Sequence, residues 1–401
     1  MSSINLAKRA KLLKPSPILM LAARAGEMKA AGHPVISLSI GEPDWDTYEN
    51  IKEAAITSIK NGMTKYTPPA GIPDLRKAIA QQVSEDLKIN YEPTQVTVSS
   101  GAKFVLFAAL QTLVDPGDEV ILVAPFWASY TTMVELADGQ PRIAVCTEET
   151  DFKLTPALLR ASITPKTKVL LLNSPSNPTG KVYSREELKK LAEVLREFPK
   201  IAVISDDIYN RLSFDSKVAP HLLEVAPDLR DRVVILNGAS KSYAMTGWRL
   251  GWALGAKEII TAMSNYQSQS VSCASATSQY AAIEAIRNSD KNVAQTVATL
   301  KDRRDALVIE LGKIPGVRVA IPDGAFYLWI NIAKYMGKSF KGKTMHNSGD
   351  LAEALLEDQK VALVPGVEFG LDGYFRISFA IEKEKGKEAV TRMKTFLASL
   401  T

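Results

Sequence analysis

The amino-acid sequence predicts an α/β protein with a large domain and a smaller α+β domain. Short β-rich runs alternate with helical patterns through the middle of the chain, which is typical of a mostly parallel sheet flanked by helices. Several of these runs are continuously apolar, as strands buried on both faces are. The C-terminal quarter mixes strands and helices without that alternation, which indicates a second, smaller unit.

Seven runs in the middle of the chain have the composition of strands. They are QVTVSSG (95–101), EVILVAPFW (119–127), PRIAVC (141–146), KVLLLN (168–173), IAVISDD (201–207), RVVILNG (232–238) and GWALGA (251–256). Helix candidates such as FVLFAALQTLV and SREELKKLAEVLREF lie between most of them, with apolar residues three or four positions apart. We therefore expect a seven-stranded, mostly parallel sheet.

The order of helical and strand-like patterns at the two ends of the chain differs from that in its middle. Residues 257–311 carry long helical patterns, and the strand-like runs VRVAI, AFYLWINI, VALVPG and YFRISFA follow, with the helix candidate LAEALLEDQ among them. We predict a large cofactor-binding domain at 48–292. Residues 1–47 and 293–401 are expected to form the small domain.

Composition excludes several classes of protein. With 46% hydrophobic and 23% charged residues among 401, the chain has the composition of a globular protein. Its 49 basic and 44 acidic residues are interspersed, so we expect no nucleic-acid partner. Two cysteines and three scattered histidines predict neither a disulfide framework nor a metal site. The early apolar run ILMLAA is too short for a membrane span and lacks the features of a signal peptide, so a reducing cytoplasm is the expected location.

Polar residues follow the predicted strands where each strand ends. Ligands of open α/β sheets bind at the carboxyl ends of the strands. The residues in question are Gly101, Ala102 and Lys103 after the first run, Trp127 after the second, Asn177 in SPSNPTG, Asp206 and Tyr209 in SDDIY, and Ser240, Lys241 and Arg249 in SKSYAMTGWRLG. Each alone has an ordinary structural explanation, such as a helix cap, a turn or a surface charge. Together they predict one site.

Pyridoxal phosphate is the cofactor that this set of residue types suits. It needs a lysine amine for a Schiff base, a carboxylate beside the pyridine nitrogen, and an anchor for its phosphate. The carboxylate keeps the ring nitrogen protonated, so the ring can accept electrons from the substrate α-carbon. The lysine must be able to lose its proton, which burial and nearby cations promote.

The motifs, in their order and spacing, resemble those of class I aminotransferases of the fold-type I pyridoxal-phosphate family. The resemblance runs from KPSP (14–17) to FRISFA (375–380). The other motifs are SIGEPDWDT (39–47), KYTPPAGIPDLRKAIA (65–80), SSGAK (99–103), PFWASY (125–130), NSPSNPTG (173–180), SDDIY (205–209), SKSYAMTGWRLG (240–251) and DGAFY (323–327). Each motif is weak alone, but the set is specific.

The resemblance implies how the cofactor is held. Lys241 forms the Schiff base and moves the proton, and Asp206 pairs with the pyridine nitrogen. Tyr209 and Asn177 donate hydrogen bonds to the ring's phenolic oxygen, and Trp127 stacks on the ring.

The resemblance also implies a phosphate pocket and a homodimer. Gly101, Ala102, Lys103, Ser240 and Arg249 surround the phosphate. A further contact to the phosphate of the partner subunit is implied for Tyr66.

For the substrate, the resemblance implies that Arg376 grips the α-carboxylate through its planar guanidinium. Gly41 passes its backbone close to the substrate, which also meets Trp127 and Asn177. Lys103 is implied to meet the distal carboxylate of a dicarboxylic amino acid, which favours aspartate or glutamate.

The residue at position 18, Ile18, bears on which of two substrate classes the sequence predicts. Relatives often carry threonine near that position, and an apolar side chain there favours an apolar or aromatic substrate instead. The sequence thus predicts transfer of an amino group from aspartate or glutamate to a 2-oxo acid such as 2-oxoglutarate by a ping-pong mechanism. An aromatic amino acid or prephenate aminotransferase is the alternative.

Three other readings remain open at this point. The same cofactor supports β-elimination and decarboxylation. A pyridoxal-phosphate-binding regulator without catalysis is a remote alternative, because only about a dozen residues precede KPSP, fewer than a helix-turn-helix module needs. A cofactor-free Schiff-base enzyme would leave Asp206 and the phosphate pocket without a role.

Overall fold

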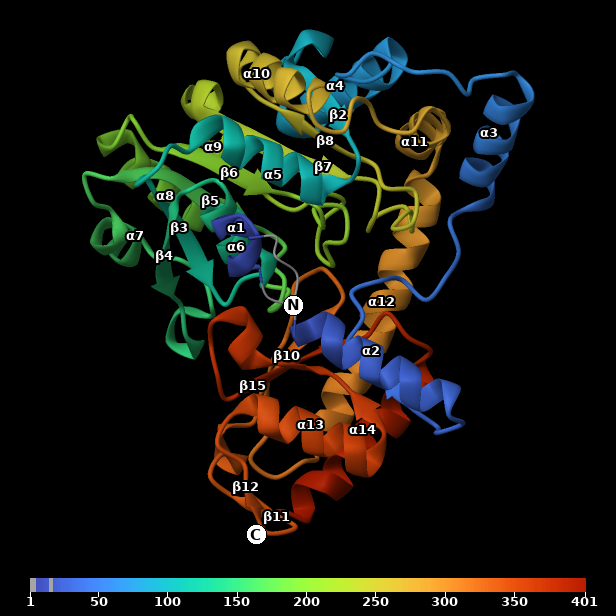
Figure 1. The fold of residues 1–401 in the computed structure, drawn as a ribbon, viewed down its shortest axis with the longest axis vertical. Helices are drawn as coiled ribbons and strands as arrows, with labels where there is room; N and C mark the ends of the chain where they lie inside the picture. The colour runs from blue at the N-terminus through green and yellow to red at the C-terminus, as the bar shows by residue number, and fades with distance from the viewer. Residues whose placement is uncertain (1–4, 14–16) are drawn as a thin grey trace.

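The computed structural model describes residues 5–13 and 17–401 of the chain (Figure 1). In this part of the chain a seven-stranded sheet has the order β2-β8-β7-β6-β5-β3-β4. Its strands are β2 (Val96–Ser99), β3 (Glu119–Ala124), β4 (Gln140–Val145), β5 (Thr167–Asn173), β6 (Ala202–Asp206), β7 (Val233–Gly238) and β8 (Gly251–Leu254). β8 runs antiparallel to β2 and β7, while the other neighbours are parallel. The predicted seven-stranded, mostly parallel sheet is confirmed.

The sheet is buried on both faces, which explains the continuously apolar strands. Along β5, Val169 and Leu171 face one apolar core, and Leu170 and Leu172 face the other. The first core contains α5 (Ala102–Leu113), α6 (Ser129–Leu136) and α10 (Lys257–Ser268). The second contains α3 (Glu49–Lys60), α4 (Pro73–Leu87), α7 (Pro156–Ser162), α8 (Arg185–Glu197), α9 (Leu222–Val225) and α11 (Ala276–Asn288).

The sequence of α8 shows how one of these helices is specified. The Ser184 side chain accepts a hydrogen bond from the Glu187 backbone, and the Glu187 side chain accepts one from the Ser184 backbone. This reciprocal pair caps the start of the helix. Leu188, Leu191 and Leu195 then recur at helical spacing and are all buried, so the same stretch fixes both the start of the helix and its buried face.

A second sheet forms the smaller unit in the lower half of Figure 1. Its strands are antiparallel and lie in the order β14-β15-β10-β9. The elements of this unit are α12 (Asp290–Leu311), β9 (Arg318–Ala320), β10 (Tyr327–Asn331), β11 (Ser339–Phe340), β12 (Lys343–Thr344), α13 (Ser348–Gln359), β13 (Val361–Ala362), β14 (Val364–Pro365), β15 (Tyr374–Ser378) and α14 (Lys383–Ala398). Its core is separate from the two cores of the large sheet. The long helix α12 runs from one unit to the other (Figure 1).

The N-terminal segment contains α1 (Lys8–Leu12), α2 (Pro17–Ala30) and β1 (Ile36–Ser37). Of these, α2 and β1 pack on the smaller unit, where β1 pairs in parallel with β13. Ala25 and Met28 of α2 join an apolar cluster with Leu356 and Ala362. The division of the chain into 48–292 and 1–47 with 293–401 stays a prediction.

Five short 3-10 turns complete the described elements. They are η1 (Pro93–Gln95), η2 (Glu148–Thr150), η3 (Pro227–Arg232), η4 (Ala333–Tyr335) and η5 (Gly366–Phe369). No helix in the described ranges is both long and apolar enough to cross a membrane.

Candidate active site

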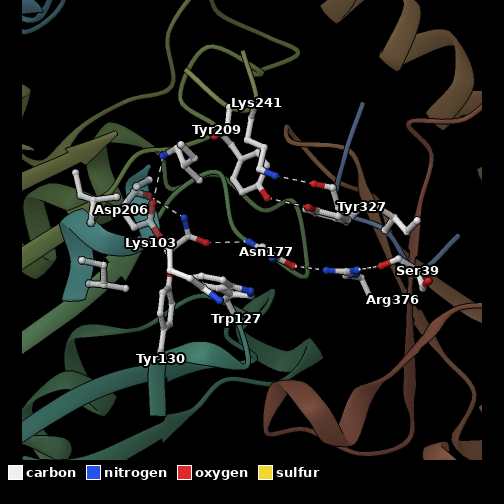
Figure 2. Close-up of a pocket in the computed structure, with 18 of the residues that line it drawn as sticks. Ser39, Lys103, Trp127, Tyr130, Asn177, Asp206, Tyr209, Lys241, Tyr327 and Arg376 are labelled. Atoms are coloured by element: carbon white, nitrogen blue, oxygen red, sulfur yellow. Dashed lines mark hydrogen bonds between the residues drawn. The ribbon is translucent and has the colours of Figure 1, made fainter. Parts of the chain in front are cut away.

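A cavity of about 390 Å³ lies where the carboxyl ends of the large sheet meet the smaller unit and the N-terminal segment. Figure 2 shows the side chains that converge on it. Its lining consists of Ala22, Ser39, Ile40, Gly41, Ala102, Lys103, Leu106, Trp127, Tyr130, Asn173, Asn177, Asp206, Ile208, Tyr209, Leu236, Ser240, Lys241, Arg249, Tyr327 and Arg376. Residues more than 300 positions apart thus share one cavity.

Lys241 follows β7 and points its amine into the cavity. Its Nζ donates a hydrogen bond to the Gly41 carbonyl at 2.6 Å. Burial lowers the pKa of this amine from 10.5 to about 8, and the positive charges of Arg376 and Arg249 add to the lowering, while Glu42 opposes it. A lysine with such a pKa has a substantial neutral fraction near neutral pH and can act as a nucleophile or a base.

Asp206 ends β6 and is 5% exposed. Its carboxylate accepts hydrogen bonds from the Tyr130 hydroxyl at 2.5 Å and from the Ile208 backbone N–H at 3.3 Å. Burial raises the pKa of this carboxyl to about 6, and both hydrogen bonds oppose the rise. The Asn173 side chain donates to the Asp206 carbonyl at 2.7 Å, which holds the strand end in place.

The turn before α5 forms a cradle for an anion. Gly101 has a φ of 89°, and a Cβ at this position would lie 2.6 Å from Nη2 of Arg249. At Gly251 a Cβ would lie 2.3 Å from the Ala102 nitrogen. Both glycines therefore permit close approach. The first N–H groups of α5, at Ala102 and Lys103, have no acceptor among the described residues, and such groups at a helix N-terminus attract negative charge.

Lys103 and Trp127 also face the cavity from the side that the large sheet forms, the sheet side. The Lys103 amine lies 4.8 Å from the centroid of the Trp127 ring. Burial lowers the pKa of Lys103, and Arg249 lowers it further. A cation over an indole face is stabilised by the ring quadrupole, so Trp127 also orients Lys103.

Arg376 lies on β15 and is 3% exposed. Its Nη1 donates to Asn177 Oδ1 at 3.2 Å, and its Nη2 donates to the Ser39 carbonyl at 2.5 Å. Its Nε is buried and has no hydrogen-bond partner among the described residues. The guanidinium lies 4.5 Å from the centroid of the Tyr327 ring. A buried cation without a carboxylate partner is costly, which indicates that an anionic ligand completes the site.

The structure brings most of the predicted site residues together. Those that line the cavity are Gly41, Ala102, Lys103, Trp127, Asn177, Asp206, Tyr209, Ser240, Lys241, Arg249 and Arg376. Gly101 adjoins the cavity through its contact with Arg249. Tyr66 does not line it and is 93% exposed. Ile18 falls within α2, but its side chain lies outside the described residues, as do residues 14–16 of KPSP.

A family model described as "Aminotransferase class I and II" matches residues 33–393. The chain belongs to this aminotransferase family.

Individual relatives extend the match over almost the whole chain. A protein of Rickettsia bellii named "Probable aspartate/prephenate aminotransferase" is 47% identical over 97% of this chain and 98% of its own length. The "Aspartate/prephenate aminotransferase" of Cereibacter sphaeroides is 45% identical over 97% of this chain and 98% of its own length. Among solved structures, the aspartate aminotransferase from Rhizobium meliloti has a TM-score of 0.95 at 40% identity and covers 100% of both chains. That from Thermus thermophilus with maleate has a TM-score of 0.91 at 36% identity, covering 98% of this chain and 100% of its own.

This aminotransferase depends on pyridoxal phosphate, and the cavity suits that group. Lys241 supplies a partly buried amine, and Asp206 supplies a hydrogen-bonded carboxylate. A Cβ at Gly101 would close the cradle, and the N–H groups of Ala102 and Lys103 in it have no acceptor in the part of the chain that the structure describes, as suits a phosphate site. Amine, carboxylate and anion cradle thus meet in one cavity.

Two functional side chains received no role from the sequence. Tyr130 donates to Asp206, and Tyr327 pairs with Tyr209 through hydroxyl groups 2.8 Å apart. Both tyrosines lie inside motifs that the sequence analysis singled out, PFWASY and DGAFY. A tyrosine in an apolar stretch is usually predicted to be a core residue. Tyr130 and Tyr327 are indeed buried, with exposures of 2% and 1%. Only the identity of the atom that each hydroxyl meets distinguishes them from core residues.

Proposed function

We propose that this aminotransferase moves the amino group of L-aspartate or L-glutamate to a 2-oxo acid such as 2-oxoglutarate by a ping-pong mechanism. The donor leaves as a 2-oxo acid before the acceptor enters the same cavity. One observation carries the choice of a dicarboxylic donor: two cations that have no carboxylate partner among the described residues, Arg376 and Lys103, face one cavity (Figure 2).

The two cations suit the two carboxylates of such a donor. Arg376 is buried, is held by Asn177 and Ser39, and keeps Nε free, so it suits the α-carboxylate that every amino acid carries. Lys103 has no hydrogen-bond acceptor among the described residues and lies over Trp127. It suits the distal carboxylate. The names of the relatives, which include aspartate, agree with this assignment.

The cofactor would be held by the wall of the cavity that the large sheet provides. Asp206 would pair with the pyridine nitrogen, Asn177 and Tyr209 would contact the phenolic oxygen, and Trp127 would cover one face of the ring. The cradle at Gly101, with Ala102, Lys103, Ser240 and Arg249, would bind the phosphate. These are the roles that the resemblance to class I aminotransferases implies, and the position of the lining groups around the cavity supports them.

Pyridoxal phosphate, when bound, supplies an electron-accepting ring that stabilises negative charge on the substrate α-carbon. The chain itself supplies the proton carrier and the orientation. With a pKa of about 8, the Lys241 amine can hold or release a proton near neutral pH. Arg376 would fix the α-carboxylate, so that the α-hydrogen faces Lys241.

An aromatic donor or prephenate is the second candidate. Ala22, Ile40 and Leu106 line the cavity with apolar surface, and Ile40 is 50% exposed. Such surface accepts a ring as readily as a short chain. The names of the relatives from Rickettsia bellii and Cereibacter sphaeroides also include prephenate.

A homodimer and a cytoplasmic location complete the proposal. Tyr66 is 93% exposed and Ile56, Ile59 and Met63 nearby are also exposed, so a partner subunit would cover apolar surface and receive Tyr66 at its phosphate. Cys146 and Cys273 are not joined to each other, as a reducing compartment allows.

A panel of amino donors tests the proposal. Purified, cofactor-loaded enzyme would be assayed with aspartate, glutamate, phenylalanine and tyrosine against 2-oxoglutarate and oxaloacetate, and with prephenate as acceptor. We expect the highest kcat/KM for aspartate or glutamate. A higher value for aromatic donors or prephenate would select the second candidate. Product formed well beyond one equivalent per active site without an added 2-oxo acid would indicate elimination or decarboxylation instead.

A further inference from the structure

Tyr327 has no part in the function proposed above, yet its side chain contacts both sides of the cavity. It begins β10 and is 1% exposed. Its hydroxyl lies 2.8 Å from the hydroxyl of Tyr209, while its ring lies 4.5 Å from the Arg376 guanidinium carbon. We propose that Tyr327 is a positioning residue that links Arg376, the carboxylate-binding group, to Tyr209, the cofactor-contacting group. The inference rests on the proposed roles of those two residues.

The direction of the hydrogen bond between the two tyrosines decides what Tyr209 can do. Each hydroxyl carries a single hydrogen. If Tyr209 donates to Tyr327, its hydrogen is used and it cannot donate to the cofactor. If Tyr327 donates to Tyr209, the hydrogen of Tyr209 is free to point into the cavity. In the second arrangement the donation also polarises the Tyr209 hydroxyl and strengthens its own donation.

The role proposed for Tyr209 requires Tyr327 to be the donor. Tyr209 is proposed to give its single hydrogen to the phenolic oxygen of the cofactor, so toward the Tyr327 hydroxyl, 2.8 Å away, it can only accept. The Arg376 guanidinium carbon lies 4.5 Å from the centroid of the Tyr327 ring, and a positive charge at that position strengthens the Tyr327 hydroxyl as a donor.

The neighbouring backbone keeps the Tyr327 hydroxyl in place. A Cβ at Gly41 would lie 2.5 Å from this hydroxyl oxygen, so only glycine leaves room for it. The same Gly41 accepts the hydrogen bond of the Lys241 amine. The ring stands edge-to-face to Tyr209, with centroids 5.7 Å apart and an interplanar angle of 82°. Figure 2 shows Tyr327 beside both Tyr209 and the segment that carries Ser39.

The first test follows the pH titration of the visible absorption band of cofactor-loaded protein, which reports the electronic state of the ring rather than turnover. A donor to the phenolic oxygen favours its deprotonated form, so loss of donation raises the midpoint pH of the band. We expect Tyr209→Phe to raise the midpoint by about 1 unit and Tyr327→Phe to raise it by roughly half as much. In the double variant, Tyr327→Phe should add nothing, because its effect passes through Tyr209.

The matched control is Tyr335→Phe. Tyr335 is also buried in the smaller unit, and its hydroxyl donates to the Pro315 carbonyl, but it does not line the cavity. This control should lower the unfolding temperature as much as Tyr327→Phe without moving the midpoint. Tyr327→Phe with an unmoved midpoint, or with a lowered one, would overturn the proposal, the latter because Tyr209 would then be the donor.

Replacing Tyr327 with 3-fluorotyrosine keeps the shape of the side chain and serves if the phenylalanine variant does not fold. Fluorination makes the hydroxyl more acidic and hence a stronger donor, so the midpoint should fall. A rise or no change would contradict the proposed direction.

The second test measures the affinity of succinate, an unreactive dicarboxylate, for the loaded protein by calorimetry. Tyr327→Phe keeps the ring beside Arg376 and should change the Kd by less than about 2-fold, whereas Tyr327→Leu removes it and should weaken binding by between about 2-fold and about 30-fold. If the two variants bound succinate equally well, the Tyr327 ring would not affect carboxylate binding by Arg376, and that part of the proposal would be wrong. The first test does not depend on which donor the enzyme prefers, so a different donor preference overturns only that part of the proposed function. A loaded protein without a visible band would overturn the function and the role of Tyr327 together.

Discussion

Asp206 and Arg376, which lie on opposite sides of the cavity, differ in how completely their polar atoms are paired among the described residues. On the sheet side, Asp206 is held by Tyr130 and the Ile208 N–H, and Asn177 is held through Asn173. On the opposite side, formed by the smaller unit and the N-terminal segment, Nε of Arg376 has no hydrogen-bond partner within residues 5–13 and 17–401, and the guanidinium lies against aromatic rings.

The difference matches the two kinds of ligand that the sides are proposed to hold. A cofactor remains bound through many turnovers, so the groups that hold it gain from being fixed in advance. A substrate enters and leaves in every cycle, so its site must release it as well as bind it. The predictions below alter one side at a time, in order of decreasing expected effect.

Lys241→Ala removes the reactive group of the sheet side. We expect transamination to fall by on the order of 10⁴-fold or more, because both the covalent anchor and the proton carrier are lost. A coupled assay with aspartate and 2-oxoglutarate measures the loss, and the absorption spectrum shows whether the visible band disappears. Lys313→Ala, at a lysine that is 55% exposed, is the control and should leave both unchanged. Normal turnover of the Lys241 variant would contradict the assignment of Lys241 as the covalent anchor and proton carrier.

Arg376→Leu changes the opposite side alone. We expect kcat/KM to fall by roughly 10²-fold to 10³-fold for every donor, because all amino acids carry the α-carboxylate that would bind there. The cofactor should stay bound, since its contacts lie on the other side. Steady-state kinetics with four donors and the visible spectrum give the two readings. Arg160→Leu, at an exposed ion pair with Glu197, is the control. Loss of the cofactor from the Arg376 variant would show that the two sides do not act separately.

Lys103→Ala sharpens the comparison, because Lys103 belongs to the sheet side by position and is proposed to bind substrate. We expect kcat/KM to fall by about 30-fold for aspartate and by about 3-fold for phenylalanine, since only aspartate has a distal carboxylate. The ratio of the two values measured on one preparation is the decisive quantity. A loss of equal size for both donors would assign Lys103 to the phosphate alone.

The smallest expected effect is the pH dependence of cofactor loading, which reports how far burial lowers the pKa of the Lys241 amine. Because burial lowers the pKa of its amine to about 8, the reactive neutral form increases as pH rises and is largely complete above about pH 9. The loading rate of cofactor-free protein should therefore increase by about 5-fold from pH 7 to pH 8 and level off near pH 9. Stopped-flow absorbance measures it. A rate that still rises tenfold per unit up to pH 10 would indicate an ordinary, exposed lysine.

Much of the fold was predictable because local patterns specify it. The seven strand-like runs and helices such as α11 at Ala276–Asn288 appear where their apolar spacing indicated. The order of strands was not predictable in this way. β8 follows β7 in the chain and inserts antiparallel between β7 and β2, which depends on how the long turn at 239–250 folds back. That turn includes Arg249 at a φ of 53°, a conformation that local propensity disfavours.

The residues of the candidate site also divide into those that could be predicted from the sequence and those that could not. The residues proposed to contact the cofactor could be predicted from the sequence, because they follow strands whose carboxyl ends meet at one edge. Tyr130 and Tyr327 could not, because a hydrogen bond between buried side chains leaves no periodic signal in the chain.

By itself, the sequence determined the α/β class, the residue types needed to bind pyridoxal phosphate and the lysine that would react with it. These follow from apolar periodicity and from the chemistry of single side chains. The tertiary structure decided which of these groups share a cavity, that Arg376 comes to lie there with a free nitrogen, and that Tyr327 contacts both Arg376 and Tyr209. The reason is physical: burial and pairing, which set the pKa of Lys241 and the hydrogen bonds of Tyr327, arise only when segments far apart in the chain pack together.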